Sequence, residues 1–409
     1  MEPHRLGAKQ AARLIESGEL SAQKLVLSCL ERIGAREPDV KAWVVLNRDL
    51  PEKVHAPLFG VPVGVKDIFD THDMPTEYGS PIYAGHRPRA DAAAVSVTRR
   101  AGGTILGKTV TAEFATFVPR ATRNPLNLAH TPGGSSSGSA AAVADFMVPL
   151  ALGTQTAGSL IRPASYCGIV GFKPTYNVLP RAGVKPGADS LDTLGVYGRS
   201  VEDVAFFAGA LTARADLEGT VDEKPKIGIC RTQEWGLVQP EMRRTLEEAG
   251  RMLGAREVEI PGGLRESHTA ILWYEIARSL ADEFTRFPDK LDPGLRERCA
   301  GGFALDPKKY VAAQRHAAAC RASLDQVFGE LDVLLAPAAT GEAPKGTAST
   351  GDVALNVVWT LLHAPCVAVP AGRGPNSLPL GLQVVGRIGD DARTLACARW
   401  IEKRLGGSQ

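Results

Sequence analysis

Short apolar segments alternate along the chain with stretches whose apolar residues recur at helical spacing. Such an alternation is typical of an α/β fold, in which helices bury a sheet. The segments that we expect to form strands are 41–46, 104–107, 148–153, 226–230, 332–337, 365–370 and 380–386. The helical patterns lie at 21–34, 91–101, 140–146, 201–211, 240–253, 268–286, 307–329 and 391–404. The sequence therefore predicts an α/β protein with a parallel or mixed sheet.

The composition is that of a globular chain with a large core. Hydrophobic residues make up 44% of the 409 residues and charged residues 22%, which excludes a disordered chain. The 47 basic and 45 acidic residues nearly cancel, and no run of like charges stands out, so we expect neither a nucleic-acid nor a membrane partner. The first residues lack the apolar stretch of a secretion signal, and no segment approaches the roughly 18 apolar residues that span a bilayer. We therefore expect a cytoplasmic protein.

The seven cysteines are scattered, and no two of them form a C-x-x-C pair. Their odd number and wide spacing argue against a disulfide framework and favour reduced thiols. The cysteines and the eight histidines also show no spacing typical of metal ligands. We expect neither a metal nor a cofactor.

Two segments are unusually rich in small residues. The first, TPGGSSSGSAAAVAD at 131–145, could be a flexible linker by composition alone, but it passes directly into an alanine-rich helical pattern. The second, GTQTAGSLIRPAS at 153–165, follows a predicted strand. Small residues allow backbone N–H groups to point at a ligand without side chains intervening. We therefore expect the chemistry of the protein to lie here.

A third segment, LFGVPVGVKDIFD at 58–70, places Lys66 among valines, an isoleucine and a phenylalanine. A lysine in such a run lies either at an edge or in the interior. Burial disfavours the ammonium form and lowers the pKa, so a buried lysine becomes a usable base near neutral pH. Taken alone, the segment favours a structural lysine.

Two motifs point to other enzyme classes. GGTILGKT at 102–109 matches the P-loop pattern, but a helical pattern precedes it and its middle is typical of a strand, so we do not expect nucleotide hydrolysis. GSSSG at 134–138 matches the nucleophile elbow of Ser-His-Asp esterases. That mechanism needs a histidine, and His268, His316 and His363 have no distinctive sequence setting.

The three segments together resemble the amidase signature family, whose members use a Ser–cis-Ser–Lys triad. GVPVGVKD supplies Lys66, GGSSSGS supplies Ser135 in a cis peptide, and GTQTAGSLIRPASYCG supplies Ser159. The separations of 69 and 24 residues match the family. The likeness covers about residues 60–175 and is strongest to short bacterial members such as malonamidase, which share Gln155 and an arginine three residues after the nucleophile, here Arg162.

The resemblance implies a single domain over residues 1–409, with one large mixed sheet covered by helices on both sides. It also implies that Ser159 attacks the amide carbonyl to form an acyl-enzyme, while Ser135 relays its proton to neutral Lys66. The backbone N–H groups of the oxyanion hole would belong to Thr156, Ala157 and Gly158.

Further residues of these segments are expected to support the reaction. Thr154 would hydrogen-bond to the relay, and Ser136 would contact the substrate. Arg162 either ties its loop to backbone carbonyls or clamps a substrate carboxylate, which suits the geometry of a guanidinium. Residues 176–190 and the C-terminal half are expected to set specificity.

The function that we expect from the sequence is hydrolysis of a small linear amide, such as the carboxylate-bearing malonamate. The expected partner is then a small-molecule amide, and the likeness to malonamidase implies a homodimer. The alternative is a glutaminase-type subunit of an amidotransferase complex, which delivers ammonia to a partner. The short chain argues against this alternative. A Ser-His-Asp esterase is the more remote alternative.

Overall fold

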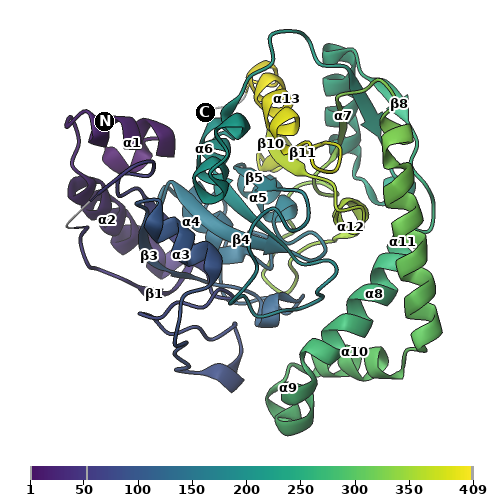
Figure 1. Ribbon diagram of the computed structural model, residues 1–409, viewed down its shortest axis with the longest axis horizontal. Helices are drawn as coiled ribbons and strands as arrows, with labels where there is room; N and C mark the ends of the chain where they lie inside the picture. Colours follow the sequence, from purple (N-terminus) through teal and green to yellow (C-terminus); the bar gives the residue numbers. More distant parts are fainter. Residues whose placement is uncertain (1, 52–53, 407–409) are drawn as a thin grey trace.

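A mixed β-sheet forms the centre of the computed structural model, which describes residues 2–51 and 54–406 (Figure 1). Its strands are β1 (Trp43–Leu46), β2 (Pro62–Lys66), β3 (Thr104–Thr109), β4 (Leu150–Gln155), β5 (Val170–Lys173), β6 (Thr193–Gly198), β7 (Ile227–Cys230), β8 (Arg256–Val258), β9 (Val333–Pro337), β10 (Cys366–Arg373) and β11 (Pro379–Val385). Within the described ranges the sheet has 11 strands in the order β1-β3-β2-β4-β6-β5-β10-β11-β9-β7-β8. β2 runs parallel to β3 and β4, and β7 runs parallel to β8 and β9, whereas the other pairs are antiparallel.

The predicted α/β fold with one large mixed sheet is confirmed. Every residue of β4, β6 and β11 is buried, so both faces of the central sheet are covered. The α-helices are α1 (Ala8–Glu16), α2 (Ala22–Val40), α3 (Ala93–Arg100), α4 (Ser137–Ala144), α5 (Ile161–Cys167), α6 (Val201–Thr212), α7 (Pro240–Leu253), α8 (Leu264–Ser279), α9 (Ala281–Arg286), α10 (Pro293–Ala304), α11 (Pro307–Phe328), α12 (Ala354–Leu361) and α13 (Asp391–Arg404). Short 3-10 segments lie at Pro3–Arg5, Pro81–Tyr83, Glu113–Ala115, Ala215–Glu218, Gln233–Leu237 and Pro288–Lys290.

The start of helix α2 is set by local sequence, whereas its length also depends on tertiary contacts. The Ser21 side chain caps its start by accepting a hydrogen bond from the Lys24 amide. The helix continues past its predicted end at residue 34, because Arg36 bonds to the buried carboxylate of Asp145 and holds the next turn in place. It ends at Val40, and the following residue, Lys41, adopts a left-handed conformation.

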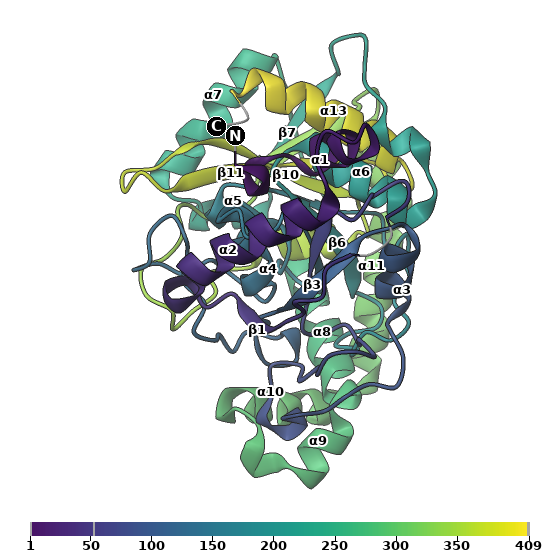
Figure 2. The same ribbon diagram turned by 90° about the vertical axis from the view of Figure 1, so that its left-hand side faces the viewer.

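Helices α8 to α11 form an arm, and α9 and α10 protrude from the body in both views (Figures 1 and 2). Within the arm, α8 packs against α10 and α11, and it also packs against α12 of the body. One buried residue of α8 is His268. Helix α8 therefore connects the arm to the body of the molecule.

The described helices include none that combines the length and the apolar character needed to cross a bilayer. All seven cysteines are buried and free of disulfide bonds. Strands from residues 43 to 385 enter the same sheet, and the single domain over residues 1–409 that the resemblance implies stays a prediction.

Candidate active site

Lys66 ends β2, in the parallel part of the sheet, and its side chain is fully buried. Its Nζ lies 2.8 Å from Ser135 Oγ and 2.6 Å from Thr154 Oγ1. The neighbouring carboxylate of Asp67 does not pair with it, because that carboxylate lies 2.9 Å from Lys108 Nζ. Burial lowers the pKa of Lys66 to about 7, against a smaller opposing effect of the Asp192 charge. A neutral amine is therefore available near neutral pH, in contact with two hydroxyl groups.

Ser135 lies in a loop that is fixed on both sides. The Gly134–Ser135 peptide bond is cis, as the resemblance implies. The Gly134 carbonyl accepts a hydrogen bond from Arg162 Nη2 at 2.6 Å, and the Ser135 carbonyl accepts one from the Ala112 amide at 3.1 Å. The glycine- and serine-rich run is therefore an ordered, buried turn before α4, and not a linker.

Ser159 is the last residue of a turn that we call the oxyanion loop, residues 156–159, between β4 and α5. Its side chain is largely buried, and its carbonyl accepts from the Ser136 amide at 3.4 Å. This bond places Ser159 against the turn that carries Ser135. Among the described residues, the amide groups of 156–159 find no protein acceptor. Unpaired N–H groups in a largely buried turn are what an oxyanion needs for its stabilisation.

The backbone of the oxyanion loop needs no left-handed residue at Ala157, whose φ is not positive. Gly158 is required for a different reason. A Cβ atom at this position would lie 2.6 Å from Asn356 Oδ1 and 2.8 Å from Arg162 Nη1. No side chain fits there unless these neighbours move.

Arg162 ties two loops together. Its Nε donates to the Thr350 carbonyl at 2.8 Å, and its Nη2 donates to the Gly134 carbonyl at 2.6 Å. The side chain is almost fully buried, and Nη1 alone has no hydrogen-bond partner in the described part of the chain. The structure thus shows the loop-tying role of Arg162, and the role as a carboxylate clamp stays a prediction.

The Ser136 side chain forms two hydrogen bonds with the backbone of Thr154. The Ser136 hydroxyl donates to the Thr154 carbonyl at 3.2 Å and accepts from the Thr154 amide at 3.3 Å. Both bonds join the serine turn to β4, and any substrate contact of Ser136 has to compete with them. Thr154 in turn contacts Lys66, as the sequence leads us to expect.

A cavity of about 350 Å³ opens beside Thr154 and Thr156. Its walls come from Ile68, Ala115 and Leu194 and from the loop 181–189, which lies within the region expected to set specificity. Asp192, which the sequence does not single out, also lines the cavity. Its Oδ1 accepts a hydrogen bond from Thr156 Oγ1 at 2.5 Å, and burial raises its pKa. The only sequence signal for Asp192 is its place in a turn-rich stretch of small residues.

The two rival motifs do not form the sites that they would need. Lys108 lies in β3 rather than in a loop, and it forms a fully buried ion pair with Asp67. His268, His316 and His363 bond to the Thr156 carbonyl, the Ser267 hydroxyl and the Ser190 carbonyl, respectively. In the described ranges none of the three histidines bonds to a serine of 134–138, so a Ser-His-Asp triad is not assembled there.

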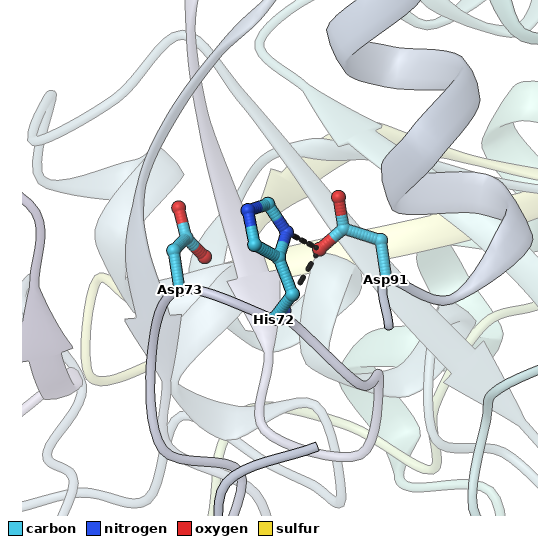
Figure 3. Close-up of side chains that lie close together, drawn as sticks. All are labelled: His72, Asp73 and Asp91. Carbon is cyan, nitrogen blue, oxygen red and sulfur yellow. Dashed lines mark hydrogen bonds and ion pairs between the residues drawn. The ribbon is translucent and has the colours of Figure 1, made fainter. Parts of the chain in front are cut away.

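His72, Asp73 and Asp91 lie close together in a way that sequence spacing does not reveal (Figure 3). Their arrangement could in principle hold a cation. However, Arg99 already pairs with both carboxylates, at 2.7 Å from Asp73 Oδ2 and 3.0 Å from Asp91 Oδ2. A larger cavity of about 680 Å³ is lined in part by Asp91, but not by Lys66, Ser135 or Ser159.

Comparison with known proteins gives one consistent result. The sequence model of the family described as Amidase matches residues 25–395. The curated relatives include the A subunit of the glutamyl-tRNA(Gln) amidotransferase of Desulforapulum autotrophicum, which is 30% identical over 100% of this chain and 99% of the relative. The corresponding subunit of Roseiflexus castenholzii is 33% identical over 96% of this chain and 94% of the relative.

Solved structures agree with these relatives. A structure described as an amidase has a TM-score of 0.90 at 30% identity and covers 98% of this chain and 100% of its own. The A subunit of the glutamyl-tRNA(Gln) amidotransferase of Thermotoga maritima has a TM-score of 0.82 at 29% identity, with 98% and 95% covered.

The expectation of a homodimer with a small-molecule amide as its partner is wrong, because these relatives are named as one subunit of an amidotransferase and so point to heteromeric partners. The shortness of the chain does not exclude such a subunit, since the matches extend over nearly the whole length of the relatives. On its matched residues and its relatives, this chain belongs to the amidase signature family of enzymes, which act on C–N amide bonds.

Proposed function

We propose that this chain is the amide-cleaving, ammonia-releasing subunit of an amidotransferase-type enzyme, and that it works through an acyl-enzyme on Ser159. One observation carries the catalytic part of the proposal. The buried Nζ of Lys66 lies 2.8 Å from Ser135 Oγ, and its pKa is lowered to about 7. This arrangement provides a neutral base that is in contact with a hydroxyl and held on a strand.

The proposed proton movements use this contact, together with the bond from the Ser136 amide to the Ser159 carbonyl that places Ser159 beside the serine turn. Ser159 Oγ attacks the carbonyl carbon and passes its proton to Ser135 Oγ, which passes its own proton to Lys66 Nζ. When the C–N bond breaks, the same relay returns a proton to the leaving nitrogen, so that ammonia departs and an ester on Ser159 remains. Water then attacks the ester, with the relay again accepting the proton. The carboxylate product leaves and the serine is restored.

The negative charge that develops on the carbonyl oxygen is met by the unpaired amide groups of the oxyanion loop. In comparable sites, loss of one such donor lowers kcat about 10²- to 10³-fold. The loop is well suited to this task because Thr156 is held through its hydroxyl by Asp192. Its donors therefore need little reorganisation when charge develops.

The substrate that we propose is glutamine, whose side-chain carboxamide would be cleaved. The cavity beside Thr154 carries cationic side chains, Arg181 and Lys185, and carboxylates, Asp189 and Asp192. Arg181 pairs with Asp189 at 3.1 Å and Lys185 pairs with Glu283 at 2.5 Å, and a zwitterion adds one charge of each sign to these pairs without unbalancing them. The names of the curated relatives support the same reading, since each is one subunit of an amidotransferase.

The test is ammonia release from glutamine, measured for the chain alone and for the complex in which it is isolated from its native host. Ser159→Ala should abolish release, whereas Ser17→Ala, a change at an exposed serine after α1, should leave it unchanged. We expect the complex to be more active than the chain alone. Equal turnover of glutamine with and without partners would overturn the proposed role in a complex, and undiminished release by Ser159→Ala would overturn the acyl-enzyme.

A further inference from the structure

We propose that His268, on the arm helix α8, is a positioning residue that sets the direction of the oxyanion donors from outside the signature segments. The inference rests on the proposed acyl-enzyme chemistry at Ser159. It concerns a residue that lies 112 positions from the loop that it contacts. It assigns to the arm a part in catalysis.

The argument starts from peptide geometry. In a trans peptide the C=O of one residue and the N–H of the next point in opposite directions. His268 Nε2 lies 2.9 Å from the Thr156 carbonyl oxygen, which can only accept, so Nε2 carries the proton and donates it. By drawing this carbonyl toward α8, His268 turns the Ala157 N–H to the opposite side.

The next two peptides are fixed in the same manner. Thr360 Oγ1, on α12, donates to the Ala157 carbonyl at 2.8 Å, which turns the Gly158 N–H the other way. The Arg162 amide donates to the Gly158 carbonyl at 3.1 Å, which orients the Ser159 N–H. Three successive peptide planes are thus held by their carbonyl oxygens. The N–H groups on their other edges are those that find no protein acceptor among the described residues.

The hydrogen bond from His268 sets the orientation of the first of these peptide planes. The side chain of Thr156 is already anchored by Asp192, so the orientation of its carbonyl is the remaining freedom. The imidazole is buried, and burial lowers its pKa to about 4, so that it stays neutral at working pH and donates through one nitrogen. Its hydrogen bond goes to a carbonyl and not to a serine hydroxyl, so it positions the loop and does not act as the base.

The inference predicts a specific kinetic signature. Without the donor, the Thr156–Ala157 peptide can rotate, and the transition state loses stabilisation that the ground-state amide barely uses. We expect His268→Phe, which keeps a ring but no donor, to lower kcat by about 10- to 100-fold, somewhat less than outright removal of an oxyanion donor. KM should change by less than about twofold.

His268→Gln is the rescue variant, because its side-chain amide can donate from nearly the position of Nε2. It should restore kcat to within about threefold of the wild type. His316→Phe is the matched control. This histidine, on α11, contacts Ser267 Oγ and not the oxyanion loop, so its loss should leave kcat unchanged.

A second readout does not depend on glutamine or on partners. A fluorophosphonate probe modifies an activated serine through a transition state with a charged P–O group, so its rate reports on the same donors. Intact mass should show slow labelling of His268→Phe and restored labelling of His268→Gln. Thr360→Val, which removes the donor to the Ala157 carbonyl, should also label slowly. If His268→Phe does not fold, His268→Leu, which likewise lacks a donor, takes its place.

Wild-type kcat and labelling in His268→Phe, or a glutamine variant as slow as the phenylalanine variant, would overturn the inference. So would a change in KM with kcat preserved. These outcomes differ from failure of the proposed function, in which Ser159→Ala would keep its activity and its labelling.

Discussion

Replacing Lys66 by methionine should abolish activity and at the same time stabilise the folded chain in a pH-dependent way. The side chain is fully buried and, in the described residues, is paired with no carboxylate. Its pKa is lowered from 10.5 to about 7. Because the folded pKa lies below the unfolded value, the unfolded chain binds more protons between pH 7 and 10.5, and the stability of the wild type rises with pH in this window.

The magnitude follows from these two pKa values. Relative to an unshifted lysine, Lys66 costs the folded state about 4 kcal/mol at pH 7 and about 1 kcal/mol at pH 9.5. Methionine removes this cost, and it also removes the contacts with Ser135 and Thr154, whose contribution is nearly the same at both pH values. The stability of Lys66→Met relative to the wild type should therefore fall by about 3 kcal/mol between pH 7 and 9.5.

Urea denaturation at the two pH values measures this difference. Lys24→Met, at an exposed position of α2, is the control and should show no such change with pH. A free-energy difference between Lys66→Met and the wild type that is the same at pH 7 and 9.5 would refute the reasoning. In addition, kcat/KM of the wild type should lose about tenfold per pH unit below pH 7, because protonated Lys66 cannot accept the relayed proton.

Three further predictions concern neighbouring residues. Gly158→Ala should lower kcat about 100-fold and destabilise the fold by about 1–3 kcal/mol, because its Cβ would lie 2.6 Å from the buried Asn356 Oδ1; kinetics and a melting curve check this, and normal kcat contradicts it. Arg162→Lys should cost about 3 kcal/mol in urea denaturation, since a lysine cannot hold both backbone carbonyls; wild-type stability would show that these bonds contribute nothing. Lys108→Met should lower the free energy of unfolding by about 3–5 kcal/mol, because it leaves the buried Asp67 carboxylate unpaired. The loss of stability should largely disappear in the double variant Lys108→Met, Asp67→Leu. A loss that persists in the double variant would contradict the ion-pair explanation.

Elements with complete local signals could be predicted to the residue. Helix α7 begins at Pro240 and ends before Gly254, the two residues that most often mark the first turn and the end of a helix, and its predicted bounds match the structure. α13 likewise spans its predicted residues, Asp391–Arg404. In both helices the apolar spacing and the end signals agree, so the tertiary structure had nothing to override.

Elements without such signals could not be predicted. α5 contains Pro163 inside a run of small residues typical of a turn, and it forms because all seven of its residues are buried against the sheet. α12 is buried on every side and therefore lacks an amphipathic period. α8 begins at Leu264, four residues before its predicted start, since Gly263 precedes it without a side-chain cap.

The residues of the candidate site fall into the same two groups, those with a local sequence signal and those without one. Lys66, Ser135 and Ser159 lie in segments whose local composition marks them, and the resemblance to a family assigns their roles. Asp192 and His268 contact the oxyanion loop only because β6 and α8 pack beside it. Their partners are far away in the sequence, so no local pattern could identify them.

The most direct test of the central claim is to locate the acyl group during turnover. The wild-type enzyme is quenched with acid while it hydrolyses glutamine, and the peptides that contain Ser135 and Ser159 are examined by mass spectrometry. The account predicts a glutamyl ester on Ser159 that is absent from Ser159→Ala and that hydroxylamine intercepts as a hydroxamate. An ester on Ser135 or Ser136, or rapid turnover with no covalent adduct and no hydroxamate, would contradict it.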